Sequence, residues 1–190
     1  MSDSHVIDQV RVTPLSLPLK QPYVWSQGVE HAFHVNLIEL ATDEGIVGYG
    51  ETTTAPDAAG QKLVLERLAE SFKDRSVFEF SARRDEAFRA RFLAFGGNMP
   101  RYANQLFAGF EMAALDLQGK LLGRPVWDLL GGARRESVGY FYFLQGETVE
   151  AIALDAEQAI SEGHPVIYLK VGVEESHDIA AVRAVREVIG

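Results

Sequence analysis

The chain has 190 residues, of which 47% are hydrophobic and 10% aromatic, so it can bury a core and is not a disordered polypeptide. Its formal net charge of −9 argues against nucleic acid or an anionic membrane surface as a partner. It contains no cysteine, which excludes disulfides, thiolate catalysis and cysteine-bound zinc. The segment "MSDSHVIDQV" lacks the basic and apolar regions of a secretory signal, and no apolar run approaches the roughly 20 residues that span a bilayer. We therefore expect an acidic cytoplasmic protein.

The first part of the chain predicts a three-stranded antiparallel meander. Residues 6–19 mix β-branched residues with two prolines, which is typical of an edge strand and predicts that the strand ends near Pro18. Residues 31–42 alternate between apolar and polar side chains, as a half-buried strand does. The turn signal "DEG" at 43–45 then leads into a returning strand at 46–51.

The hydrophobic period then changes to that of helices. Residues 60–72 and 79–95 carry apolar side chains close to a helical spacing. Residues 104–123 predict a third helix, which is apolar around most of its surface and should therefore be buried between layers. We expect this helix to end at Gly123. We expect its Asp116 to satisfy backbone donors or an arginine rather than to take part in chemistry.

In the second half, strands and helices alternate. We expect strands at 137–145 and 166–172, and helices at 148–163 and 175–190, the last with Ser176 as a possible N-cap. This order is typical of βαβ units and predicts a parallel sheet.

A glycine-rich, basic stretch at 129–137 marks the expected boundary between the two regimes. We therefore assign residues 1–133 to an N-terminal domain and residues 134–190 to a second one. Two parallel strands are too few for an independently stable sheet, and a helix is still running at the last residue. We expect the opening of a longer α/β domain; the alternative is that these elements complete another chain.

One lysine interrupts the apolar run "PVIYLKVGV" at 165–173. So rich a run of Val, Ile and Leu predicts a strand buried on both faces, where lysine is rare. Because side chains alternate along a strand, one face is wholly apolar and the other carries both polar groups. The apolar face consists of Ile167, Leu169, Val171 and Val173, and the other face of Val166, Tyr168, Lys170 and Gly172.

Lys170 lies near the C-terminal end of this strand, which is where parallel sheets and barrels build active sites. Desolvation disfavours the charged form of an amine, so a lysine there can serve as a general base or form a Schiff base. The alternative is a lysine that reaches past the strand end into solvent.

Other candidates are weaker. The histidines show no spacing typical of metal ligands, and His31 and His34 lie on opposite faces of a strand. The "GYGE" at 48–51 does not open a helix, so a dinucleotide-binding loop is not predicted. Tyr23 and Trp25 fall in a predicted loop, where two roles stay open: capping a ligand pocket and simple packing.

Four stretches together carry a likeness to a known family. They are "VTPLSLPLKQPY" (12–23), "LATDEGIVGYGET" (40–52), "FEMAALDLQGKLLGRPVWDLLGG" (110–132) and "IYLKVG" (167–172). In this order they resemble the enolase superfamily, in its mandelate racemase/muconate lactonizing branch. The third is the most specific, because it resembles the family's "ALxDLxGKxxGxPxxxLLGG" block. The likeness covers essentially the whole chain.

The resemblance implies an α+β capping domain, with a three-stranded antiparallel meander plus helices, followed by the first βαβα part of a modified TIM (β/α) barrel. Family members abstract the proton α to a carboxylate and stabilise the enediolate on Mg²⁺. Lys170, followed by Val171 and Gly172, matches the second lysine of the family's Lys-x-Lys motif, which acts as the base. Tyr168 stands where the first lysine would be and cannot supply its like-charge repulsion. We expect Tyr168 to pack beside Lys170 or to hydrogen-bond a substrate oxygen.

The resemblance also implies that loops of the capping domain, here 23–31 and 52–57, close over the site. The residues expected to contact substrate are Tyr23, Trp25, Thr53, Thr54 and Tyr168. Glu51 is expected to be structural. We assign no metal ligand in this chain, because the three Mg²⁺-binding carboxylates and the opposite acid/base would lie beyond Gly190.

The leading hypothesis is a Mg²⁺-dependent racemase, epimerase, cycloisomerase or acid-sugar dehydratase that acts on a small-molecule carboxylate. Family members are usually oligomeric, so a homo-oligomer is expected. Two alternatives stay open: a non-catalytic relative or structural domain in which Lys170 is merely a strand-end lysine, and a Schiff-base enzyme such as an aldolase. The sequence does not predict the substrate or the step that follows the enediolate.

Overall fold

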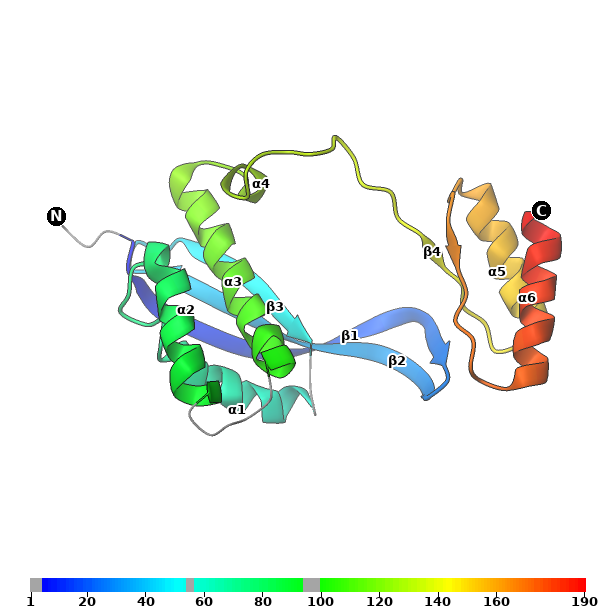
Figure 1. Cartoon of the computed structure of the whole chain (residues 1–190), viewed down its shortest axis with the longest axis horizontal. Coiled ribbons are helices and arrows are strands. Elements are labelled where there is room, and N and C mark those ends of the chain that lie inside the picture. Colours follow the sequence, from blue (N-terminus) through cyan, green and yellow to red (C-terminus); the bar gives the residue numbers. More distant parts are fainter. Residues whose placement is uncertain (1–4, 54–56, 94–99) are drawn as a thin grey trace. The chain divides into compact units, whose positions relative to one another are not determined.

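The computed structural model describes residues 5–53, 57–93 and 100–190 (Figure 1). The chain forms two compact units, Met1–Leu17 with His34–Arg134, and Pro18–Phe33 with Arg135–Gly190. Each unit has its own hydrophobic core. Every helix within the described ranges is too short or too polar to cross a lipid bilayer.

Three strands follow one another at the N-terminal end: β1 (Ile7–Trp25), β2 (Gly28–Thr42) and β3 (Val47–Thr53). Their order in the sheet is β1-β2-β3, and β2 pairs with β3 in antiparallel register. The turn between β2 and β3 is closed by a hydrogen bond that the Thr42 N–H donates to the Ile46 carbonyl at 3.0 Å. The predicted three-stranded antiparallel meander is confirmed.

The prediction that the first strand ends near Pro18 is wrong, because β1 continues to Trp25. The strand lies at the edge of the sheet. An edge strand tolerates proline, because the missing N–H would have faced away from the neighbouring strand. Tyr23 and Trp25 are therefore strand residues rather than loop residues, and the turn is reduced to residues 26–27.

The helical segments of the first unit are α1 (Ala58–Ala69), η1 (Val77–Glu79), α2 (Phe80–Phe88), the π-helical turn η2 (Arg89–Leu93), α3 (Pro100–Leu122) and α4 (Val126–Leu129). The three predicted helices thus exist, with α3 beginning four residues before its predicted start. α3 packs against β3 along one face only, and Met112 on its other side is 44% exposed. The predicted burial of α3 between two layers is therefore wrong for the described chain.

The glycines of "GYGE" allow α3 to lie directly on the sheet. A Cβ on Gly48 would come within 2.2 Å of the Ala113 carbonyl oxygen, and one on Gly50 within 2.0 Å of the Gly109 carbonyl oxygen. Neither distance is possible for a real side chain, so the close approach of helix and strand requires these residues to be glycine. The two glycines of this motif therefore serve the packing of α3 on β3, a role that the sequence did not predict.

Two polar contacts of α3 follow the sequence expectation for Asp116. Its Oδ2 accepts the Tyr49 N–H of β3 at 2.8 Å and a Lys120 ammonium proton at 2.7 Å. A backbone donor is therefore satisfied as expected, and the cation is a lysine rather than an arginine.

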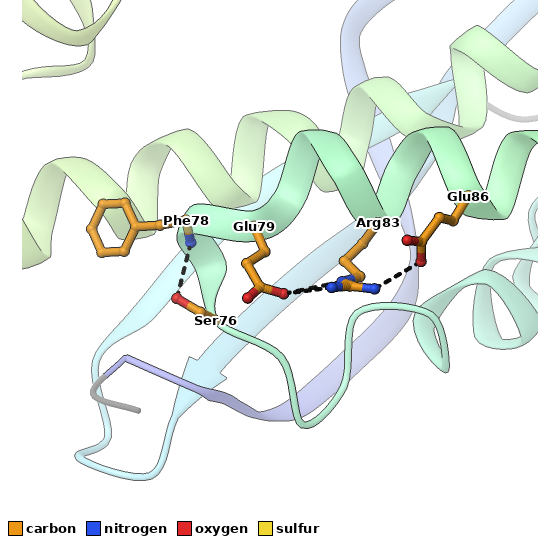
Figure 2. A network of polar contacts seen from close by, with 5 residues as sticks. All are labelled: Ser76, Phe78, Glu79, Arg83 and Glu86. Atoms are coloured by element: carbon orange, nitrogen blue, oxygen red, sulfur yellow. Dashed lines mark hydrogen bonds and ion pairs between the residues drawn. The ribbon is translucent and has the colours of Figure 1, made fainter. Parts of the chain in front are cut away.

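A ladder of charged side chains lies on the surface of η1 and α2 (Figure 2). Ser76 caps the N-terminus of η1, where its Oγ accepts the Phe78 N–H at 3.4 Å. One turn later the Arg83 guanidinium lies 2.9 Å from Glu79 and 2.8 Å from Glu86. Hydrogen bonding to Glu79, followed by the charge of Glu86, raises the pKa of Arg83 above its ordinary value.

The second unit contains β4 (Tyr142–Phe143), α5 (Val149–Ser161), β5 (Ile167–Tyr168) and α6 (Glu175–Ile189). β4 and β5 pair in parallel, so the predicted βαβα order and parallel pairing are confirmed. Both strands are shorter than predicted. The prediction of Ser176 as N-cap is wrong, because the Glu174 carboxylate accepts the N–H groups of Ser176 and His177 instead.

Candidate active site

The two faces of β5 have different surroundings. Ile167 and Leu169 pack against the core formed with α5 and α6, as the predicted alternation requires. Tyr168 is 43% exposed, so the predicted burial of this strand on both faces is wrong for the described chain. Val171 and Val173, expected on the covered face, are 53% and 54% exposed because the strand ends at Tyr168. The helices therefore cover only the first part of the predicted apolar face.

Lys170 follows β5 and is half-buried. Its ammonium donates a hydrogen bond to the Tyr23 phenol oxygen at 2.6 Å. Nζ also lies 4.7 Å from the ring centroid of Trp25, 5.1 Å from that of Tyr23 and 5.8 Å from that of Phe143. These distances are in the range of cation–π attraction. The amine is thus held by the end of β1 and by a residue of β4, all within the second unit.

The rings around Lys170 form a continuous aromatic cluster. Its members are Tyr23, Trp25, Phe33, Phe141, Phe143 and Tyr168. Tyr168 stacks on Phe143 with ring centroids 4.8 Å apart, and Phe143 in turn contacts Tyr23 at 5.3 Å. The Tyr168 ring therefore packs against the aromatic rings that lie beside the amine.

A hydrogen-bonded chain of polar groups, not identified from the sequence, lies at the end of β4. The Gln145 Oε1 accepts the Val24 N–H at 3.0 Å, and the Gln145 N–H donates to the Asp155 Oδ2 at 2.7 Å. The Tyr142 hydroxyl donates to the other oxygen of Asp155 at 2.9 Å. Burial, and next this hydrogen bond, raise the pKa of Tyr142 to about 12.

One feature of the sequence could have identified Asp155, although it was not among the predicted site residues. It lies on α5 between Ile152 and Ala156, both buried, and Ala159 on the same helix is buried as well. A carboxylate beside the apolar face of an amphipathic helix needs a partner near that face. The signal identifies the need for a partner but not the residue that supplies it.

The remaining predicted substrate contacts are not placed beside Lys170 by the second unit. Thr53 ends β3 and is paired with Val35 in the first unit. Thr54 lies outside the described residues. Glu51 is an exposed residue of β3, opposite Leu37.

The described residues do not fit a metal ion on their own. Across residues 5–53, 57–93 and 100–190, no group of three or more His, Asp or Glu side chains lies close enough to hold one. Lys170 and His177 line a cavity of about 40 Å³ at the N-terminal end of α6. That volume accommodates a water molecule and is too small for an organic substrate.

Comparisons with known proteins identify relatives along the whole chain. A cis-3-hydroxy-L-proline dehydratase from Roseibium aggregatum is 31% identical over 194 residues, which cover 96% of this chain and 50% of that protein. Other relatives are named racemases, epimerases and cycloisomerases. The chain spans about half the length of the curated relatives it matches.

Solved structures share the fold. A muconate lactonizing enzyme from Pseudomonas fluorescens, complexed with muconolactone, aligns with a TM-score of 0.85 at 24% identity, over 98% of this chain and 51% of that one. A dipeptide epimerase from Enterococcus faecalis, complexed with Mg and the dipeptide L-Leu-L-Tyr, aligns with a TM-score of 0.82 at 24% identity, over 97% and 51% of the two chains.

The family described as "Mandelate racemase / muconate lactonizing enzyme, N-terminal domain" matches residues 7–131. This range covers β1 to α4, including the meander and the close contact between α3 and β3. The chain therefore belongs to the mandelate racemase/muconate lactonizing enzyme family, and its first unit is built as the capping domain of that family.

Proposed function

We propose that the protein carrying this chain is a Mg²⁺-dependent isomerase or lyase that removes the proton α to a carboxylate, with Lys170 as the base. The possible outcomes are racemisation or epimerisation, cycloisomerisation and dehydration. The observation that carries the proposal is the position of the Lys170 amine, which is held by the Tyr23 hydroxyl at 2.6 Å among aromatic rings just after β5. The family of the chain supports it.

The surroundings of Lys170 suit a proton acceptor. The neutral amine would take the proton from carbon, and the electron pair of the broken C–H bond would move into the enediolate. The resulting ammonium would donate to the Tyr23 oxygen and face the rings of Trp25 and Phe143. Both interactions would hold the protonated amine in place after the transfer.

Magnesium enters the proposal through the relatives, one of which was solved with Mg. A divalent cation would stabilise the negative charge of the enediolate. Because the described residues of this chain offer no cluster that fits the ion, we expect its carboxylate ligands, together with the opposite acid/base, in strands that follow Gly190.

Substrate contacts are proposed for Tyr23, Trp25, Thr53, Thr54 and Tyr168. Trp25 has support from the structure, because its indole N–H has no acceptor among the described residues. A buried donor of this kind is available to a carboxylate or carbonyl oxygen once the ring shifts.

Three further properties stay predictions. They are a cytoplasmic location, a (β/α) barrel completed by further strands, and a homo-oligomer, which light scattering would measure.

The test is exchange of substrate α-hydrogen with deuterium in the full-length protein with Mg²⁺, followed by NMR over a panel of carboxylates. The panel takes its classes from the relatives: hydroxyproline, dipeptides, N-succinyl amino acids and muconate. We expect Lys170→Ala to abolish exchange while leaving the circular dichroism spectrum unchanged. Lys73→Ala is the matched control, because Lys73 is an exposed lysine of the first unit.

Exchange retained by Lys170→Ala would eliminate this residue as the base. Borohydride trapping of a carbonyl substrate on Lys170 would instead favour the Schiff-base alternative, because the enediolate route forms no imine. Absence of exchange from the wild-type protein over the whole panel would favour a non-catalytic relative.

A further inference from the structure

Two consecutive residues of β1 contact the ends of two neighbouring parallel strands. The Tyr23 side chain accepts from Lys170, after β5, and the Val24 N–H donates to Gln145, after β4. Because the two contacts are one residue apart on an extended strand, fixing the Val24 amide also restricts where the Tyr23 ring can lie. The hydrogen bond to Gln145 therefore acts on the group that holds the Lys170 amine.

The Val24 N–H needs this partner. β1 is an edge strand, so the N–H groups on its outer side have no ladder acceptor. Pro22, two residues earlier, carries no N–H, so Val24 is the last donor on this side before the turn at residues 26–27. The Gln145 side chain supplies the acceptor.

Gln145 is itself firmly placed. Its backbone N–H donates to Asp155 at 2.7 Å, and the preceding Leu144 is buried in the core of the unit. A Cβ on the following Gly146 would come within 2.8 Å of the Ile152 nitrogen, so the backbone lies directly against the start of α5. Gln145 is thus hydrogen-bonded to α5 through its backbone and to β1 through its side chain. A shift of α5 would therefore also move the end of β1.

We propose that Gln145 is a positioning residue that fixes the end of β1, and through it keeps the Tyr23 hydroxyl on the Lys170 amine. The proposal rests on the proposed function for its kinetic readout, but not for its structural one. Gln145 contacts Val24 and Asp155 rather than the Lys170 amine. It acts through Val24 and Tyr23, and its loss should misplace the amine without removing it.

The experiment compares Gln145→Ala, Gln145→Glu and Gln158→Ala in the full-length protein. Glutamate keeps an acceptor oxygen for the Val24 N–H, so Gln145→Glu is the conservative rescue. Gln158 is the matched control, because it is an exposed glutamine whose side chain donates to Glu162 on the surface of α5. Circular dichroism and thermal unfolding establish that each variant is folded.

The structural readout is hydrogen exchange of the Val24 amide, measured by mass spectrometry on peptides spanning the β1–β2 turn. We expect exchange to accelerate about five- to tenfold in Gln145→Ala, as for one lost neutral hydrogen bond. Reductive methylation of the Lys170 amine should accelerate in the same variant. Both rates should stay at the wild-type value in Gln158→Ala and return toward it in Gln145→Glu.

The kinetic readout is the separation of kcat from KM for α-proton exchange. A displaced base lowers kcat, and we expect a loss of about ten- to hundredfold in Gln145→Ala with KM changed about twofold or less. A wild-type kcat in a folded Gln145→Ala would overturn the positioning role while leaving the proposed function intact.

If the wild-type protein exchanges no α-proton, the proposed function fails, and the two structural rates still decide the inference. An unchanged Val24 exchange rate and an unchanged Lys170 methylation rate in Gln145→Ala would overturn it. Accelerated rates would retain Gln145 as the residue that fixes β1 against Lys170.

Discussion

The two units use their aromatic residues in opposite ways. In the first unit Phe72, Phe107 and Phe110 are almost fully buried between the sheet and the helices. In the second unit α5 and α6 cover one face of the two-stranded sheet, and the other face presents Phe141 at 55% and Tyr168 at 43% exposure. The rings of the first unit form a closed core, whereas those of the second unit form a partly exposed cluster beside the Lys170 amine.

The kinds of contact differ between the two units as well. In the first unit the backbone of β3 lies directly against α3 at Gly48 and Gly50, where an added Cβ would overlap carbonyl oxygens of the helix. In the second unit the notable contacts are polar and directional, from Lys170 to Tyr23 and from Gln145 to Val24. We therefore expect substitutions in the first unit to act on folding and, under the proposed function, substitutions around Lys170 to act on activity.

A large effect on folding is expected from Gly50→Ala. Its Cβ would come within 2.0 Å of the Gly109 carbonyl oxygen and 2.8 Å of the Ala113 nitrogen, so α3 must move off the sheet. We expect a loss of about 3 kcal/mol or more in the free energy of unfolding, measured by urea denaturation.

Gly139→Ala is the control for this substitution. An added Cβ there meets no atom within 4 Å, and its backbone is not in the left-handed region. We expect a change within about 0.5 kcal/mol. A Gly50→Ala protein as stable as wild type would show that α3 and β3 are less tightly packed than described.

A matched pair of aromatic truncations tests the comparison itself. Phe72→Ala removes a buried ring that contacts Phe80 and Phe110, and we expect a loss of about 3–5 kcal/mol in the free energy of unfolding. Tyr168→Ala removes a partly exposed ring stacked on Phe143 and should cost about 1 kcal/mol, mostly from the lost stacking. Equal losses of unfolding free energy in the two variants would contradict the distinction between the closed core of the first unit and the partly exposed aromatic cluster of the second.

The elements that the sequence predicted well are those with a strong hydrophobic period. The alternation of 31–42 and the helical spacing of α1 and α3 reflect burial on one side, which leaves a direct trace in residue order. The extent of β1 could not be predicted in the same way. Proline ends a central strand but not an edge strand, and edge position is a property of the sheet rather than of the segment.

The sequence singled out Lys170 as the candidate base, and the resemblance pointed to Tyr23 and Trp25, but neither predicted how these residues contact one another. Lys170 stands out in the sequence because a charged residue interrupts an apolar run, a signal carried by a few adjacent residues. Its contact with Tyr23 joins residues 147 positions apart, and local pattern contains no information at that range. The role of Gln145 could not be predicted for a related reason. It depends on where the side-chain oxygen lies relative to the Val24 N–H, which residue order does not reveal.

Tyr142 provides a pH-dependent test of the second unit. Its pKa of about 12 in the folded protein lies above the ordinary value of 10, so folding favours the neutral phenol. The stabilisation is fully present below pH 10 and is lost as pH rises through 12. Titration followed by ultraviolet absorbance should show one late tyrosine that is absent from Tyr142→Phe. We expect Asp155→Asn to shift this titration partway toward 10, because burial remains; no shift would remove Asp155 as a cause.

The smallest effect is expected on the charged ladder of Figure 2. Arg83 bridges Glu79 and Glu86 at short distances, yet all three side chains are partly or largely exposed to solvent. Exposed ion pairs are screened by salt and restrict side-chain freedom, so geometry alone is a poor guide to stability. We expect the melting temperature of Arg83→Gln to equal that of wild type within error in 0.5 M NaCl, with at most a small decrease at low salt. A large decrease that persists in high salt would show that the exposed face of α2 contributes to the fold as its buried face does.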